Sequence, residues 1–418
     1  MFDFGRDLRR LFSRRRPAED LGWVELLPVA ALELEAKRAS VDAGRVSAAQ
    51  PHEAALKSAA LWREHARRRG RLDSLERADA AAADAVLNAG DGGRRIAGRM
   101  SAIANLIARF DLVGGPEGLA AAGRMLEDLG DPPTDVLKAE AAVLHARLAL
   151  RLGLLLAMPT ARQDSLALAD AALSAAEVVG LPTAMLDDLR LERAGALLEA
   201  GLADRDSRLL DQAGRLLREM VEASSAEARP LTRARALALC GVGLGALARM
   251  AGDAAARTQA VAMVEAATDL FTADHSPLDW AALLVARGDL EQPPSLAHLR
   301  AVERLLAPDA SILAAALRER RLEQEALAAE KAGDLGALSK IEASLRRRLG
   351  ARAAGVAEPP HAFDWIADQI ALGHVAAARG RLLGRPAALP RLALAEAVAL
   401  AKEEGAFALA ARAEALLT

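Results

Sequence analysis

The stretch PTAMLDDLRLERAGALLEAGLADRDSRLLDQAGRLLREMVEASSAEARP, residues 182–230, decides the fold. It begins and ends with a proline, and between them a polar turn separates two runs rich in Leu, Ala, Arg and Glu. Proline suits a helix start because the amide that it lacks would have no partner there. The stretch therefore predicts a helical hairpin, with Pro182 and Pro230 opening the first helices of two successive hairpins.

The same punctuation recurs along the chain. Pro133, Pro182, Pro230 and Pro277 are separated by 49, 48 and 47 residues. A fixed period with one helix-opening proline in each unit predicts a helical repeat array. The second helix of each unit carries the pattern apolar, acid, any residue, Ala, which occurs at Leu75–Ala78, Ala169–Ala172, Leu210–Ala213 and Val264–Ala267. Leu119 and Ala122 keep the spacing without the acid, and the small Ala permits close approach of paired helices.

Composition agrees with an all-helical chain. Of 418 residues, 52% are hydrophobic but only 3% are aromatic, and Tyr is absent. Ala and Leu head the helix-propensity ranking, and Arg and Glu follow closely. Sheets favour β-branched and aromatic residues instead. The sequence therefore predicts an all-α fold, and its abundance of Ala, Arg, Gly and Leu is typical of a GC-rich bacterial genome.

We expect five segments along the chain. The last third is less regular, with a charged helix pair broken at Gly333 and Asp334, and with a small, apolar linker at 351–360. The predicted segments are a basic amphipathic N-terminus (1–17), a leading helix and its connection (18–52), the repeat array (53–310), the charged helix pair (311–350) and a C-terminal helical cap (361–418).

The N-terminal segment is the sharpest local feature. Phe4, Leu8, Leu11 and Phe12 fall on one helical face, and Arg9 and Arg10 belong to an arginine-rich remainder. This composition favours docking on an anionic membrane surface or on a partner. A helix that caps the array and a frayed tail are the alternatives, and the pattern does not choose among them.

Charge and cysteine content exclude several classes of function. The formal net charge is −3, and the basic clusters at 67–71 and 346–348 have no aromatic residues beside them, so we expect no nucleic-acid partner. Cys240 is the single cysteine, which excludes an intrachain disulfide. No run approaches the roughly 20 apolar residues of a membrane span, and residues 1–17 lack the features of a secretory signal. These features predict a cytoplasmic protein.

Sites for cofactors, metals or catalysis are not expected either. The glycines of GVGLG at 241–245 lie between helical runs, which predicts close helix packing instead of a phosphate loop. The seven histidines show no i, i+4 pair with an acid, as a zinc helix would require. His361, Asp364 and His374 form the nearest grouping, but 13 residues separate the two histidines. We therefore expect no cofactor, no metal and no enzymatic activity.

Two matching helix starts add a family resemblance. Leu278-Asp279-Trp280-Ala281 and Phe363-Asp364-Trp365-Ile366-Ala367, with the Pro and Ala patterns above, resemble the tetratricopeptide-repeat superfamily in a long-period bacterial variety. The resemblance implies an α-solenoid of stacked helix hairpins whose first helices line a groove, with an irregular C-terminal part. It implies a scaffold or adaptor that binds a protein segment, peptide or helix, in that groove.

Four arginines on predicted first helices are the candidate partner-binding residues: Arg190, Arg193, Arg233 and Arg235. Paired guanidiniums could hold the carboxylates of a partner, although a solvated convex face fits their spacing equally well. A self-assembling structural protein is the second hypothesis, and an enzyme regulator or enzyme is the third. The sequence does not indicate an oligomeric state.

Overall fold

A computed structural model describes residues 21–45, 50–290, 296–306, 312–353 and 362–418. Within these ranges the chain forms eighteen α-helices, one short 3-10 helix and no strand, which confirms the all-α prediction. Neighbouring helices pack together in chain order, as an α-solenoid requires. The chain divides into two compact units, residues 1–108 with 119–291 and residues 109–118 with 292–418.

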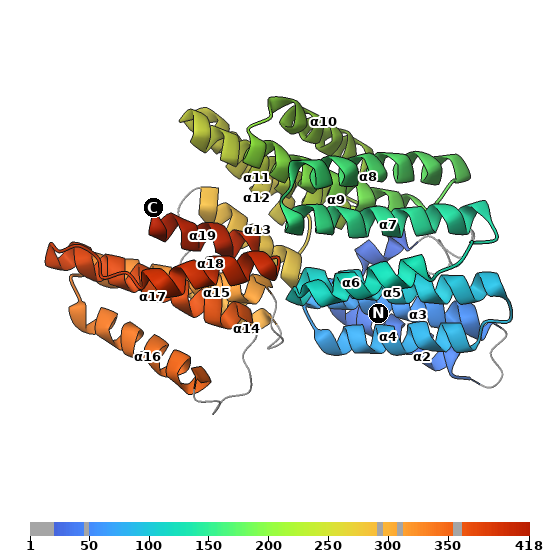
Figure 1. The fold of residues 1–418 in the computed structure, drawn as a ribbon, viewed down its shortest axis with the longest axis horizontal. Helices are drawn as coiled ribbons and strands as arrows, with labels where there is room; N and C mark the ends of the chain where they lie inside the picture. The colour runs from blue at the N-terminus through green and yellow to red at the C-terminus, as the bar shows by residue number, and fades with distance from the viewer. Residues whose placement is uncertain (1–20, 46–49, 291–295, 307–311, 354–361) are drawn as a thin grey trace, which may run out of the picture. The chain divides into compact units, whose positions relative to one another are not determined.

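Unit 1 consists of a leading segment and a series of helical hairpins (Figure 1). Its elements are η1 (Gly22–Leu26), α2 (Val29–Ala43), α3 (Pro51–Arg69), α4 (Leu72–Leu87), α5 (Gly92–Val113), α6 (Pro116–Glu127), α7 (Asp135–Leu156), α8 (Pro159–Val179), α9 (Thr183–Asp204), α10 (Ser207–Ala223), α11 (Pro230–Ala251), α12 (Ala254–Thr268) and α13 (Pro277–Leu290). Residues 109–118, at the end of α5 and the start of α6, group with unit 2.

The proline punctuation marks the helix starts as predicted. Pro230 and Pro277 are the first residues of α11 and α13, Pro182 caps α9, and Pro133 lies two residues before α7. The alanines of the second-helix pattern are all buried, and they are Ala78, Ala122, Ala172, Ala213 and Ala267. Each hairpin therefore closes on a small residue, which lets the two helices of the pair approach closely.

The array in unit 1 closes on itself. The first helices α7, α9, α11 and α13 contact one another in turn, and α13 also contacts α3. The backbone N–H of Val29 donates to the carbonyl of Asp274 at 3.0 Å. Gly70, which ends α3 at a φ of +75°, lies so near Leu278 that a Cβ there would come within 3.2 Å of its Cδ1. The ends of the array thus hold each other.

Glu25 and Arg68 are the polar groups that secure this closure. The Glu25 carboxylate accepts hydrogen bonds from the Arg229 Nε at 2.6 Å and from the backbone N–H of Thr232 at 2.9 Å. It thereby serves the unpaired amides at the start of α11. Arg68, whose side chain is fully buried, donates to the carbonyls of Val24 and Leu27. Both contacts fasten the leading segment to the array.

Three glycines on α11 allow close helix packing on three sides of it. A Cβ at Gly241 would lie 2.7 Å from Val264 of α12, one at Gly243 would lie 2.8 Å from Leu198 of α9, and one at Gly245 would reach a Leu290 methyl on α13. This confirms close packing at GVGLG. By length and composition alone, α11 is the one helix among those described that could cross a membrane.

Unit 2 is arranged around one central helix. It contains α14 (Leu296–Leu305), α15 (Ile312–Lys331), α16 (Leu335–Ala353), α17 (Ala362–Leu383), α18 (Arg391–Glu403) and α19 (Phe407–Leu417). Helix α17 contacts α15, α16, α18 and α19, and two apolar clusters lie against it. Gly114 belongs here because a Cβ on it would collide with the carbonyl oxygen of Glu404. The residues of the predicted linker beyond 353 lie outside the described ranges.

Candidate functional site

The first helices of unit 1 carry a connected set of charged side chains, which we call the inner charged network. Its members come from five helices: Arg63, Glu64 and Arg67 of α3, Arg147 and Arg151 of α7, Asp188 and Glu192 of α9, Arg235 of α11, and Asp279 of α13. These helices are the ones that follow one another around the closed array. The network therefore faces the interior of unit 1.

Ion pairs of good geometry join these helices. Arg67 donates to both carboxylate oxygens of Asp188 at 3.1 Å, although 121 residues separate the two. The Glu192 carboxylate accepts hydrogen bonds from Arg147 and Arg151, each at an N–O distance of 2.6 Å. Two parallel hydrogen bonds of this kind fix orientation as well as charge.

Arg235 of α11 and Asp279 of α13 form a further ion pair of the network. Arg235 Nε and Nη2 lie 2.9 and 2.6 Å from the two carboxylate oxygens, and the Ser276 hydroxyl donates to Asp279 at 2.6 Å. The side chains of Arg67 and Asp188 remain 34% and 33% accessible, and those of Arg235 and Asp279 17% and 22%. Water therefore reaches this interior face, which a packed core would not allow.

The network holds three of its carboxylates, Glu64, Glu192 and Asp279, ionised. Burial would raise the pKa of Glu64, but Arg68, Arg67 and Arg235 lower it to about 2. Burial would also raise the pKa of Asp279, but Arg235 and hydrogen bonds lower it to about 2. The pKa of Glu192 is lowered by Arg147 and Arg151 against the effect of burial. These carboxylates carry full negative charge at neutral pH.

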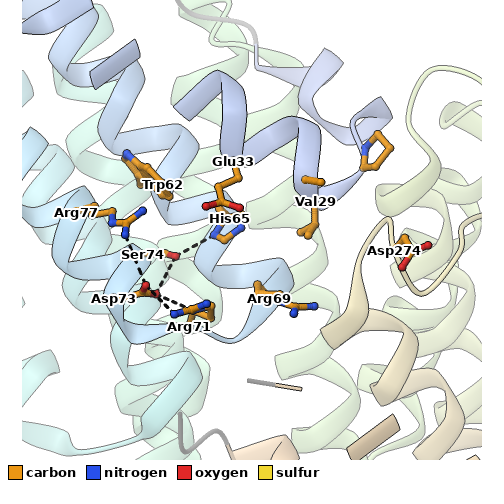
Figure 2. A pocket seen from close by; sticks show the side chains of 12 residues that line it. Val29, Glu33, Trp62, His65, Arg69, Arg71, Asp73, Ser74, Arg77 and Asp274 are labelled. Carbon is orange, nitrogen blue, oxygen red and sulfur yellow. Dashed lines mark hydrogen bonds and ion pairs between the residues drawn. The ribbon is translucent and has the colours of Figure 1, made fainter. Parts of the chain in front are cut away.

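A second site is a cavity of about 470 Å³ among α2, α3, α4 and the segment before α13 (Figure 2). The Arg77 guanidinium lies 4.6 Å from the centre of the Trp62 ring on its wall, and Arg71 pairs with Asp73. His65 Nδ1 lies 2.9 Å from the Ser74 hydroxyl. Both of these side chains are buried, so Ser74 is not presented as a nucleophile.

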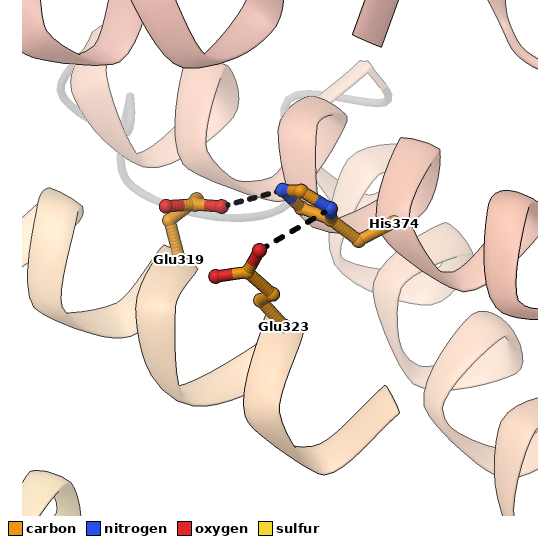
Figure 3. A group of neighbouring side chains, drawn as sticks. All are labelled: Glu319, Glu323 and His374. Atoms are coloured by element: carbon orange, nitrogen blue, oxygen red, sulfur yellow. Dashed lines mark ion pairs between the residues drawn. The ribbon is translucent and has the colours of Figure 1, made fainter. Parts of the chain in front are cut away.

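A third cluster lies in unit 2, where Glu319 and Glu323 of α15 point toward His374 of α17 (Figure 3). One ligand atom from each lies within 4.8 Å of the others, a spacing that a cation could use. Arg412 Nη2, however, donates to Glu319 at 2.7 Å and to Glu323 at 2.8 Å. The guanidinium already supplies the positive charge, and a metal ion would have to displace it. The cluster is an internal ion network.

The four predicted partner-binding arginines are dispersed. Arg235 belongs to the inner charged network. Arg190 and Arg193 instead pair with Glu177 and Asp170 of α8, the second helix of the neighbouring hairpin. Arg233 donates to the carbonyls of Val221 and Ser224 at the end of α10. The structure thus brings one of the four to the interior.

The predicted docking residues Phe4, Leu8, Leu11, Phe12, Arg9 and Arg10 lie outside the described residues, as does His361. The sequence analysis did not identify Arg63, Arg67, Arg147, Asp188 or Glu192 as candidate site residues. One signal could have found them, because Arg147 and Arg151, like Asp188 and Glu192, are spaced i, i+4 on predicted first helices.

Comparisons with known proteins assign no family. No family model matches the chain, and no curated protein matches it. The proposals below therefore depend on the chemistry of the residues themselves.

Proposed function

We propose that this protein is a non-enzymatic scaffold or adaptor that binds a segment of another protein through the inner charged network of unit 1. The observation that carries the proposal is the solvent accessibility of paired charges on five helices that face one interior. Ion pairs contribute little to the stability of a fold when water reaches them. A partner bearing complementary charges would meet guanidiniums and carboxylates already held in fixed orientations.

Binding is favoured over acid–base catalysis by the electrostatics of the network. A general acid or base works best when its pKa lies near the working pH. Glu64 and Asp279 have pKa values near 2, and both are held there by arginines. Such carboxylates orient and attract charged groups, but they exchange protons poorly at neutral pH.

We further propose that the protein acts in the cytoplasm and that residues 1–17 dock it at the inner membrane or on a partner. The sequence of that segment supports this part of the proposal. Removing residues 1–17 should abolish binding to vesicles that contain anionic lipid and leave the helix content unchanged. Equal vesicle binding by the shortened protein would rule out the membrane contact.

The test of the main proposal is affinity capture from a lysate with matched variants. Arg147→Gln removes one guanidinium of the network and leaves Arg151 on Glu192. Arg193→Gln is its control, because it removes an arginine that pairs with exposed Asp170 on α8. Circular dichroism and melting temperature establish that both variants fold.

We expect one dominant protein to be captured by the wild type and by Arg193→Gln, with at least tenfold less captured by Arg147→Gln. Equal capture by Arg147→Gln would contradict binding at the network. If none of the three proteins captures a partner, the adaptor hypothesis fails and the self-assembling alternative gains. Sedimentation velocity of the free protein then tests that alternative directly.

A further inference from the structure

Arg63 differs from the other arginines of the inner charged network because no carboxylate pairs with it among the described residues. Its Nη1 donates to the Asn105 side-chain oxygen at 2.9 Å and approaches the Ser101 carbonyl at 3.4 Å. Its Nε and Nη2 make no hydrogen bond to any described residue. Three of its five N–H donors (the Nε–H and both on Nη2) are therefore available.

Asn105 beside it has an unsatisfied donor. The residue is only 1% exposed, and its amide nitrogen Nδ2 has no hydrogen-bond partner in the described structure. The amide cannot be turned over to relieve this, because the oxygen is needed to accept from Arg63. Buried donors are almost always paired, so an orphan next to an unpaired guanidinium indicates a missing acceptor.

The charge balance gives the sign of the charge on that acceptor. The network contains five arginines, Arg63, Arg67, Arg147, Arg151 and Arg235, and four carboxylates, Glu64, Asp188, Glu192 and Asp279, and Arg68 also pairs with Glu64 at 2.7 Å. Arginines therefore exceed carboxylates. Burial and then the nearby charge of Arg147 lower the pKa of Arg63 to about 10. A negatively charged acceptor would reduce this excess of positive charge.

We infer that Arg63 and Asn105 form a binding site for a single carboxylate group, presented by an acidic segment of the bound protein. A carboxylate is a planar acceptor whose two oxygens match the parallel donors of a guanidinium. For one of them to accept from Asn105 Nδ2 as well, the Asn105 side chain must shift, because Nδ2 is closed to solvent in the structure. The inference depends on the proposed function, and it names the chemistry that the partner must carry.

The test is isothermal titration of the full chain with two probes at low salt. The first is hexaglutamate blocked at both ends, and the second is sodium acetate. Arg63→Gln removes the charge, and Asn105→Asp supplies a carboxylate from the chain itself. Arg193→Gln is the matched control, because its pairing with Asp170 lies outside the network.

We expect hexaglutamate to bind the wild type and Arg193→Gln with affinities within twofold of each other, and both site variants at least tenfold more weakly. Asn105→Asp should also melt at a temperature equal to or above that of the wild type, because its new carboxylate neutralises Arg63.

Equal binding to Arg63→Gln, or no binding of either probe to the wild type, would overturn the carboxylate site. Binding of acetate alone would overturn the acidic segment as its source. These failures are distinguishable from failure of the adaptor proposal. If Arg147→Gln loses a captured partner and Arg63→Gln does not, the adaptor proposal is supported and the carboxylate site is ruled out.

Discussion

The two units build charge into an Ala- and Leu-rich helical fold in different ways. In unit 2 the Glu319 side chain is fully buried, and Arg412 and His374 surround it. In unit 1 the side chains of Arg67 and Asp188 in the inner charged network remain partly accessible, and one guanidinium, Arg63, pairs with no carboxylate among the described residues. A closed cluster serves packing, whereas an accessible one with an unpaired guanidinium is available to a ligand. The predictions below test this difference.

The largest effect is expected from Arg412→Ala in unit 2. It leaves the buried Glu319 with His374 alone, and an uncompensated buried charge costs about 3–5 kcal/mol. Hydrogen exchange read by mass spectrometry should show lost protection across α15, α17 and α19. Arg379→Ala, which breaks a surface pair with Glu342, should change stability by less than about 1 kcal/mol. If unit 1 lost as much exchange protection as unit 2, the effect of Arg412→Ala would not be confined to unit 2, contrary to this prediction.

The second effect is a pH dependence confined to unit 1. Burial above all lowers the pKa of His65 to about 4, with Arg69 and Arg71 adding to the effect and Glu33 and Asp73 opposing it. The unfolded chain binds a proton below about pH 6.5, while the folded chain excludes it until about pH 4. Stability should fall by up to about 3 kcal/mol as pH drops between these values.

Urea unfolding at pH 7 and pH 4.5 measures this loss in the wild type and in His65→Gln. The variant should lose less stability over the same range, because the amide of Gln does not titrate. A pH dependence that persists unchanged in His65→Gln would assign the effect to another group. Protection of unit 2 from hydrogen exchange should respond to the substitution at neither pH.

The third effect tests whether the closure of unit 1 is cooperative. Glu25→Ala leaves the amide of Thr232 and the Nε of Arg229 without their acceptor, which should cost about 2–3 kcal/mol. Helices α2, α3, α11 and α13 should then lose exchange protection together. The exposed Glu76→Ala serves as the control and should change little. Loss limited to residues near Glu25 would mean that the array does not depend on closure.

The smallest effects have opposite signs at two glycines of unit 1. Gly241→Ala places a methyl 2.9 Å from the Ala260 carbonyl oxygen, which should destabilise by about 1–2 kcal/mol. Nothing lies within 4 Å of a Cβ at Gly195 in α9, so Gly195→Ala should stabilise by about 0.5–1 kcal/mol. Equilibrium urea unfolding measures both. Equal signs would show that α11 is not packed as described.

The hairpins were predictable because their signals are local. Pro230 opens α11 and Ala213 is buried in α10, as the repeat pattern predicts, since helix starts and close contacts within a hairpin depend on nearby residues. The closure was not predictable in this way. Arg67 meets Asp188 across 121 residues, and no local pattern specifies which first helices will face each other.

For the candidate site, the sequence predicted the type of residue but not which residues face the interior. Guanidiniums on first helices were expected to hold a partner's carboxylates, but rotation about the helix axis decides which ones face inward. On α9 the inward positions belong to Asp188 and Glu192, while Arg190 and Arg193 turn toward α8. Within the basic cluster at 67–71, Arg68 is fully buried and donates to two carbonyls of the leading segment, which no local pattern indicates.

The closure of unit 1 also imposes a delay during synthesis. The His275 side chain meets the Glu25 carbonyl across 250 residues. At about 5–20 residues per second, a ribosome needs roughly 12–50 s to make that length of chain. Throughout that time α2 and α3 have emerged without α11 and α13, which complete the closure. The nascent chain therefore exposes apolar surface long enough for a chaperone to bind it.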